Sequence, residues 1–512
     1  MMDGLWLGVP CGDRISNPAI RASGGSSLEF FSSIRETMTP TSIRRATEFQ
    51  GAHVNNEYDA IIIGTGQSGP SLASRLSAAG MKVAVVERKR FGGTCVNTGC
   101  VPTKALVASA YAAHLVRHAA DYGVITGSGV TVDMKRVKAR KDAISGHSSE
   151  AVEKWMKGLA NSRVIEGHAR FTSPNSVRVN DEIFTAGKIF INVGGRALVP
   201  PIPGLKNVPY LTNSTMMDVD FLPRHLIILG GSYIGLEFGQ MYRRFGSEVT
   251  IVERAPRLIG REDEDVSQGV LDILGGEGVR AELNADVSGA EQRGGEIAVK
   301  INRAGVPGEV IGSHLLLAIG RVPNTDDLGL DKAGIATDAR GYIQVDDGLR
   351  TSVPGIWAVG DCNGRGAFTH TSYNDYEIVA DNLLNGDSRS VLDRISAYGL
   401  FIDPPLGRVG MTDTEVRNSG REALAGKRPM SRVGRAVEKG DTRGFMKVTV
   451  DAKTKQILGA AILGTAGDEA IHCIIDAMYA KAPYTVVQRA VHIHPTVSEL
   501  LPTLLGELKP LG

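Results

Sequence analysis

The stretch FGGTCVNTGC, Phe91 to Cys100, contains two of the chain's five cysteines, Cys95 and Cys100. A close cysteine pair can form a structural disulfide, bind a metal ion, or open and close during a redox reaction. The separation is too long for the CxxC pattern of zinc sites, and no second Cys/His pair lies nearby to complete four ligands. A metal site is therefore disfavoured, whereas the disulfide and redox roles stay open.

Local geometry limits how the two cysteines can pair. Residues five positions apart in a regular helix rise about 7.5 Å along its axis, which exceeds the roughly 6.8 Å limit between bridged Cα atoms. The pair cannot be bridged inside an undistorted helix. Glycines between positions 92 and 99 allow a bent backbone, and Pro102 is tolerated only near a helix start. We infer a helix beginning near Cys100, whose N-terminal dipole and nearby Lys104 favour a thiolate.

A second group with chemical potential lies in VHIHPTVSELL, residues 491 to 501. A thiol that attacks or leaves needs a base near neutral pH, and His494 can serve, with Glu499 fixing its tautomer. His492 has the weaker case, because a lone histidine near a helix is more often a structural hydrogen-bonding group. The remaining cysteines are predicted to be free thiols without a role: Cys11, Cys362 and Cys473.

The elements that position these groups begin at Asp59. DAIIIGTGQSGPSLASRLSAAGMKVAVVER reads as a strand, a Gly-rich turn, a helix and a second strand that ends in Glu87. The GxGxxG turn places glycine where the chain turns tightly, where backbone approaches a pyrophosphate and where helix packs on strand. Its glycines are Gly64, Gly66 and Gly69.

The same pattern returns in RHLIILGGSYIGLEFGQMYRRFGSEVTIVER, residues 224 to 254. Gly230 and Gly235 are its first and third glycines, Glu253 ends the second strand, and Ser232 replaces the middle glycine. Two dinucleotide-binding units are therefore predicted. The chain after about residue 395 reads as strands and then helices without another Gly-rich turn, which predicts a third unit without a nucleotide.

Bulk composition excludes several other classes of protein. Lys+Arg 57 against Asp+Glu 56 gives no argument for nucleic acid or an anionic membrane as partner. No apolar run approaches the roughly 20 residues needed to span a bilayer. An odd, sparse set of cysteines fits a cytoplasmic location better than a secreted one. Residues 1–53 are expected to be a disordered leader, or the start codon is placed too early and Met38 is the true start.

GGTCVNTGCVPTK, set between two dinucleotide units, resembles the signature of the class I pyridine nucleotide-disulfide oxidoreductases. This family includes lipoamide dehydrogenase, glutathione reductase and mercuric reductase. Within it, the CVNTGC sequence is most similar to the mercuric reductase-like branch. The resemblance covers nearly everything from Asp59 to Gly512. It implies FAD on the first unit, NAD(P)H on the second, and electrons flowing from nicotinamide through flavin to the cysteines.

The resemblance also implies a role for single residues. Cys100 resembles the thiol lying against the flavin, and Cys95 the interchange thiol that attacks substrate. Lys104 resembles the lysine near the flavin, paired with Glu237, and Tyr233 the residue that covers the flavin until nicotinamide enters. In the family the His494–Glu499 motif comes from the partner subunit, which implies a homodimer. The expected cofactor-binding residues are Gly64, Gly66, Gly69, Glu87, Gly93, Thr94, Asp361, Gly230, Gly235, Glu253 and Gly320.

The predicted fold class is α/β, with two Rossmann-like domains, for FAD and NAD(P), and a C-terminal α+β dimerisation domain. The boundaries expected are 54–200 and 326–392 for the FAD domain, 201–325 for the NAD(P) domain and 393–512 for the dimerisation domain. These divisions leave both cysteines in the first FAD segment and the His494 dyad in the dimerisation domain.

The substrate is less constrained than the cofactors. Mercuric reductases typically carry a vicinal cysteine pair near the C-terminus, whereas Cys473 is the last cysteine here. We therefore predict reduction of a disulfide or thiol-reactive oxidant, with a metal-ion reductase or dihydrolipoamide dehydrogenase as alternatives and a redox sensor without turnover as a third class. Glu253 favours NADH, because a carboxylate accepts ribose hydroxyls and repels a 2′-phosphate, although Arg254 and Arg257 lie close in sequence. No metal ligands are predicted.

Overall fold

The computed structural model describes residues 56–127 and 129–512, so the predicted leader, Met38 and Cys11 lie outside the described residues. Residues 57–512 form one compact unit. None of the helices in these residues is long and apolar enough to cross a bilayer.

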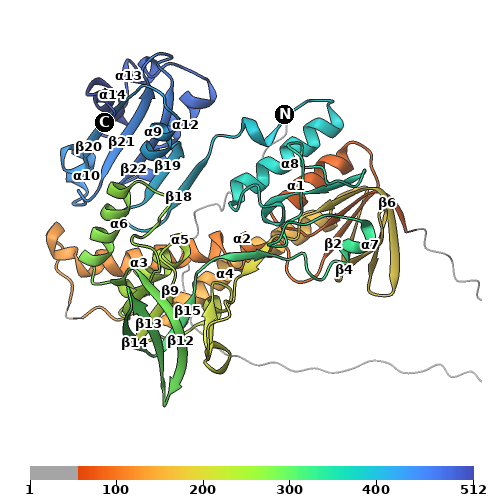
Figure 1. Cartoon of the computed structure of the whole chain (residues 1–512), viewed down its shortest axis with the longest axis horizontal. Helices are drawn as coiled ribbons and strands as arrows, with labels where there is room; N and C mark the ends of the chain where they lie inside the picture. Colours follow the sequence, from red (N-terminus) through yellow and green to blue (C-terminus); the bar gives the residue numbers. More distant parts are fainter. Residues whose placement is uncertain (1–55, 128) are drawn as a thin grey trace, which may run out of the picture. The chain divides into compact units, whose positions relative to one another are not determined.

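Two sheets are the centre of the fold, and Figure 1 labels some of their strands: the first is mixed, with β4, β5 and β6 paired antiparallel, and the second is parallel. The first has the order β3-β2-β1-β6-β5-β4, with β17 also paired to β6, and the second has the order β11-β10-β9-β15-β8. Strands of the first sheet are β1 (Glu57–Ile63), β2 (Val83–Glu87), β3 (Ser162–Glu166), β4 (Ala169–Ser173), β5 (Ser176–Val179), β6 (Glu182–Ile191) and β17 (Ile356–Ala358). Strands of the second are β8 (Tyr210–Thr212), β9 (His225–Leu229), β10 (Glu248–Val252), β11 (Arg280–Glu282) and β15 (His314–Leu317).

The central strands explain why both sheets are buried on two faces. In β1, Ile61 and Ile63 enter one core while Ala60 and Ile62 enter another. In β9, alternate residues of the run 226–229 divide in the same way between two cores. Because side chains alternate along a strand, only a continuous apolar run can fill both cores, as the sequences DAIIIG and HLIILG do.

Three smaller sheets complete the strand structure. An antiparallel meander holds β12 (Ala285–Arg293), β13 (Glu296–Arg303) and β14 (Val306–Gly312), and β7 (Gly195–Ala197) pairs with β16 (Arg321–Pro323). The C-terminal antiparallel sheet has the order β18-β19-β22-β21-β20-β23. Its strands are β18 (Ala397–Leu400), β19 (Leu406–Gly410), β20 (Ala423–Pro429), β21 (Phe445–Asp451), β22 (Ile457–Leu463) and β23 (Lys509–Pro510).

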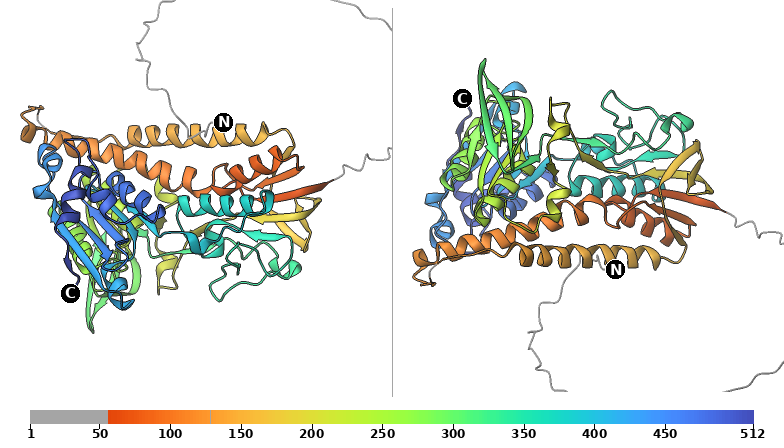
Figure 2. Two further views of the ribbon diagram at one scale, coloured as in Figure 1. Left: turned by 90° about the horizontal axis from the view of Figure 1, so that it is seen from above. Right: turned by 90° about the horizontal axis from the view of Figure 1, so that it is seen from below.

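Helices connect and cover these sheets. The two long helices α3 and α4 run side by side, as both views in Figure 2 show, while α1 packs against α8 and α3 against α5. The helices are α1 (Ser68–Ala78), α2 (Gly93–Asn97), α3 (Cys100–Arg117), α4 (Met134–Lys157), α5 (Tyr233–Phe245), α6 (Glu264–Gly276), α7 (Leu330–Ala333), α8 (Thr369–Leu384), α9 (Asp413–Asn418), α10 (Gly434–Glu438), α11 (Gly467–Ala470), α12 (His472–Tyr479), α13 (Thr485–Gln488) and α14 (Leu501–Gly506).

The predicted fold class is confirmed. A mixed sheet and a parallel sheet each contain a strand, a Gly-rich turn and a helix in succession, and an antiparallel sheet with helices closes the chain. The helix inferred to begin near Cys100 begins at that residue.

Candidate active site

The two Gly-rich turns have the same internal construction. In each, the carboxylate at the end of the second strand accepts a backbone N–H from the residue after the first glycine: Glu87 from Thr65 at 3.0 Å and Glu253 from Gly231 at 2.7 Å. Gly64 and Gly230 have positive φ, +103° and +107°, and a Cβ at either would lie 2.3 Å or 2.5 Å from a carbonyl oxygen. Glycine is therefore required at the start of both turns.

The first turn offers a surface that fits a dinucleotide. Gln67, the residue before α1, has a buried Oε1 without a hydrogen-bond partner. Gly93 approaches Gly66 so closely that a Cβ on Gly93 would lie 2.7 Å from the Cα of Gly66. Asn192 braces the turn by donating to the carbonyls of Gly64 and Gly66 at 3.2 and 3.1 Å. Bare backbone at a helix N-terminus is the kind of site that binds phosphate.

Other predicted cofactor residues lie near this turn or its counterpart. Thr94 is in α2, directly before Cys95. Asp361 follows β17, 3.4 Å from the Arg321 guanidinium, and burial raises the pKa of its carboxyl in spite of that charge. Gly320 has a φ of +146° and accepts a hydrogen bond from the backbone of Leu198.

The two cysteines lie on consecutive short elements. Cys95 is in α2, Cys100 is the first residue of α3, and both are free thiols in this structure. The pKa of Cys100 is lowered to about 6, chiefly because the Cys95 thiol donates a hydrogen bond to its sulfur. The same hydrogen bond, followed by burial, raises the pKa of Cys95 above its ordinary value. Cys100 is therefore the thiolate of the pair and Cys95 keeps its proton.

Thr369, the first residue of α8, adds a further partner to this thiolate. Its Oγ1 lies 3.2 Å from the Sγ of Cys100. This hydroxyl and the charge of Lys104 both lower the pKa of Cys100, while burial acts against them. No sequence motif pointed to Thr369, because 269 residues separate it from the cysteine it contacts.

An ion pair stands one helical turn behind the thiolate. Lys104 follows Cys100 by four residues in α3, so both lie on one face of that helix. Its Nζ is 2.7 Å from the Oε2 of Glu237 in α5. Tyr233 precedes Glu237 by four residues, and its ring lies 5.5 Å from that of Phe368. The first turns of α3 and α5 thus bring together four residues that were singled out in the sequence.

The C-terminal dyad is formed but stands apart from the thiols of its own chain. The Nδ1 of His494 is 2.9 Å from the Oε2 of Glu499, and the side chain of His494 is 80% exposed. Across the described residues, no hydrogen bond or ion pair joins the dyad to Cys95 or Cys100. His492 hydrogen-bonds only the nearby carbonyl of Ala490.

The remaining described cysteines occupy different environments. Cys362 is fully buried, donates to the carbonyls of Val359 and Ile191, and has a pKa raised to about 12 by burial. Cys473 is half-buried. Among residues 56–127 and 129–512, no three His, Cys, Asp or Glu side chains form a group that could hold a metal ion.

The two similar Gly-rich turns and the thiol pair beside an ion pair define a class of protein. Comparison of the sequence with protein families identifies the same class. The chain belongs to the pyridine nucleotide-disulphide oxidoreductase family, which matches residues 58–375, and carries that family's dimerisation domain at residues 396–505. Members of this family are FAD-dependent enzymes that act on sulfur groups with a pyridine nucleotide. The predicted family and enzyme class are confirmed.

Particular relatives narrow the comparison. The chain is 38% identical to the probable pyridine nucleotide-disulfide oxidoreductase RclA of Escherichia coli, over 89% of this chain and 100% of that protein. A solved structure titled as a Cu(II) complex of this HOCl-induced flavoprotein disulfide reductase matches with a TM-score of 0.80 and 37% identity, over 87% of this chain and 99% of that one. The chain is also 32% identical to a dihydrolipoyl dehydrogenase of Cupriavidus necator, covering 88% and 97%, and 32% identical to a mercuric reductase of Bacillus cereus, covering 81% and 66%.

Proposed function

We propose that this protein is an NAD(P)H-dependent flavoprotein that reduces a disulfide or a thiol-reactive oxidant through Cys95 and Cys100. One observation carries the proposal: Cys100 is a stabilised thiolate at a helix N-terminus, hydrogen-bonded by the protonated Cys95 and backed by the Lys104–Glu237 pair. A thiolate held beside a second thiol is the arrangement required for thiol–disulfide exchange. The relative RclA, described as a disulfide reductase, supports the same substrate class.

The FAD site is proposed at the first Gly-rich turn, with Gly64, Gly66, Gly69, Glu87, Gly93, Thr94 and Asp361 as its residues. Bound there, FAD would supply two-electron transfer between a nicotinamide and the cysteine pair. Lys104 would hold a positive charge at its edge, and Tyr233 would cover its nicotinamide side.

Substrate reduction is derived from the protonation states of the thiols. Cys95 keeps its proton, so a base must remove it before its sulfur can attack a substrate disulfide. We assign this base to His494 of the partner subunit, oriented by that subunit's Glu499. Attack of the Cys95 sulfur breaks the substrate S–S bond, forms a mixed disulfide and releases one thiol, which takes the proton held by the imidazole. The Cys100 thiolate then attacks the Cys95 sulfur, releases the second thiol, which takes a proton from solvent, and leaves the cysteines oxidised to a disulfide.

A homodimer follows from this assignment, because a base from the partner subunit completes each site. Three observations support it: the matched dimerisation domain, the exposure of His494 and the exposure of its apolar neighbours Val491 and Ile493. The domain boundaries remain a proposal, which two features of the sheets support: β17 pairs in the first sheet, and β18 to β23 form a sheet of their own.

NADH is proposed as the preferred reductant, with Gly230, Gly235, Glu253 and Gly320 in its site. The carboxylate of Glu253 is fixed by the backbone N–H groups of Gly231 and Ala255. Arg257 donates to the carbonyl of Gly260, which occupies one of the guanidinium nitrogens that could meet a 2′-phosphate. We expect a lower KM for NADH than for NADPH, and Glu253→Ala should narrow the difference.

A metal-ion reductase is the second candidate, favoured by the Cu(II) complex of RclA. A steady-state panel separates the two. Anaerobic NADH oxidation would be followed with oxidised lipoamide, glutathione disulfide, Hg(II), Cu(II) and a quinone. We expect turnover with a disulfide to exceed turnover with Hg(II), because no cysteine follows Cys473 to deliver that ion. Faster reduction of Hg(II) or Cu(II) than of every disulfide would reverse the ranking.

A further inference from the structure

Phe401, the residue that follows β18, contacts both members of the Lys104–Glu237 pair. Its backbone N–H donates to the Oε1 of Glu237 at 3.0 Å. Its ring lies 4.3 Å from the Nζ of Lys104, within the range of a cation–π contact. The other carboxylate oxygen, Oε2, binds the ammonium itself at 2.7 Å. Phe401, which lies outside α3 and α5, therefore contacts both charged groups.

The segment that carries Phe401 is fixed to α5 at two points. Glu237 accepts from residue 401, and one turn later Gln240 exchanges two hydrogen bonds with the backbone of Asp403, each at 2.7 Å. Alternate residues of the extended segment thus meet successive turns of the helix. This pairing fixes the position of Phe401 along α5.

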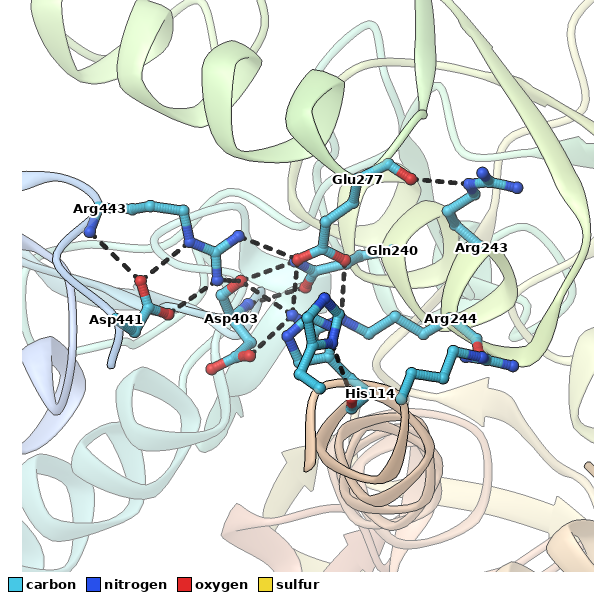
Figure 3. A network of polar contacts seen from close by, with 10 residues as sticks. His114, Gln240, Arg243, Arg244, Glu277, Asp403, Asp441 and Arg443 are labelled. Carbon is cyan, nitrogen blue, oxygen red and sulfur yellow. Dashed lines mark hydrogen bonds and ion pairs between the residues drawn. The ribbon is translucent and has the colours of Figure 1, made fainter. Parts of the chain in front are cut away.

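A buried charge network holds the far end of the segment, as Figure 3 shows. Arg244 of α5, with a side chain only 4% exposed, binds the carboxylates of Asp403 at 2.7 Å and Glu277 at 2.6 Å. Arg443 binds Glu277 at 3.0 Å and donates to the carbonyl of Asp403. Since each of these charges has a partner, the segment has little freedom to move away from α5.

We propose that Phe401 is a positioning residue for the active site: its amide holds the Glu237 carboxylate and its ring holds the Lys104 ammonium beside Cys100. The inference rests on the proposed function, which gives the Lys104–Glu237 pair its role beside the flavin. It adds Phe401, a residue that no motif identified. Lys104 is the more solvent-exposed partner, since its side chain is 34% exposed while that of Glu237 is 8% exposed. Without the ring, the ammonium keeps its ion pair with Glu237 but loses its contact on the side of Phe401, so it shifts toward water while the carboxylate stays.

This asymmetry sets the sign of the expected effect. The charge of Lys104 lowers the pKa of Cys100, and that of Glu237 raises it. Loss of the ring therefore moves a stabilising charge away and leaves a destabilising one in place, so the thiolate becomes harder to form. The expected effect is an upward shift in the pKa of Cys100.

The test uses Phe401→Leu and Phe401→Met, which keep the backbone amide and lose the ring, with Phe401→Tyr as the variant that retains it. Phe445→Leu is the matched control, because it removes a ring 3.9 Å from the ammonium of Lys427, which takes no part in the site. The reduced holoenzymes would be alkylated with iodoacetamide across pH 5 to 9, with fragment ions locating the label on Cys100. Thermal unfolding would show which variants are folded.

We expect the alkylation midpoint of Cys100 to rise in Phe401→Leu and Phe401→Met, and to match wild type in Phe401→Tyr and Phe445→Leu. Folded ring-less variants with the wild-type midpoint would overturn the inference, as would an equal shift in Phe445→Leu. Failure of the proposed function has a different signature, since wild type would then give no long-wavelength absorbance with NADH whatever the midpoints are.

Discussion

The hydroxyl of Thr369 and the sulfur of Cys100 lie 3.2 Å apart, each on the first residue of its helix. The contact places one end of α8 against the thiolate that the N-terminus of α3 already favours. The hydroxyl lowers the pKa of both sulfurs, and the hydrogen bond between the two cysteines is what lowers that of Cys100 and raises that of Cys95.

The first prediction concerns pH. The pKa of Cys100 is lowered to about 6, so its thiolate persists as pH falls and is lost only below that value. In the two-electron-reduced holoenzyme, the long-wavelength charge-transfer absorbance should therefore decrease as pH falls through about 6. Thr369→Val, which removes one stabilising hydrogen bond, should move the midpoint upward. A wild-type midpoint near 9.0, the ordinary value for a thiol, would contradict the assignment.

The second prediction separates the two cysteines. Cys100→Ser removes the thiolate that is proposed to lie against the flavin and form the charge-transfer complex, so one equivalent of NADH added without oxygen should give no charge-transfer band. Cys95→Ser cannot form the disulfide, so the band should be present before any reductant is added. Absorbance spectra of both variants measure the charge-transfer band directly. If Cys100→Ser leaves the band unchanged, the two roles have been assigned wrongly.

The third prediction tests the base. His494→Gln should lower turnover with a disulfide by about 10²- to 10⁴-fold, because a positioned acid–base group typically contributes that much. Reduction by NADH in stopped flow should keep its rate, since this step does not use the imidazole. His492→Gln is the matched control, and its turnover should stay near wild type. Equal losses in both variants would indicate a structural effect of the loop.

The fourth prediction concerns stability. Arg244→Met removes the bidentate partner of the buried Glu277 carboxylate, which keeps Arg443 at 3.0 Å, so we expect a loss smaller than the roughly 3–5 kcal/mol of a buried charge left without any partner. Denaturant unfolding should show this loss. Arg435→Met removes an arginine whose ion pair with Glu438 is exposed, and it should change the unfolding midpoint little. Comparable losses in the two variants would contradict the importance given to the network.

The parts of this protein that sequence predicts are those encoded over short distances. The start of α3 follows from Pro102 and the neighbouring glycines, and the two Gly-rich turns follow from glycines whose missing side chains leave room for nearby carbonyls. These features depend on a few consecutive residues, so their pattern is visible without the fold.

Contacts between distant segments could not be predicted in this way. Thr369 lies 269 residues from Cys100, Phe401 lies 164 residues from Glu237, and Asn192 lies 128 residues from the turn it braces. Threonine, phenylalanine and asparagine are common residues without distinctive spacing, and only the packing of helices and strands gives them a role. The Lys104–Glu237 pair was predicted only because a family resemblance supplied the partner.

The exposure of His494 has a genetic consequence. If each active site uses the imidazole of the other subunit, activity is a property of the dimer and not of one polypeptide. In a mixed dimer, a subunit that lacks the histidine would inactivate the site that contains the wild-type subunit's thiols. Its own thiols would stay active, because the wild-type subunit supplies their imidazole. Mixed populations of alleles should therefore show partial dominance, and two differently damaged chains, one without the thiol and one without the base, should complement each other.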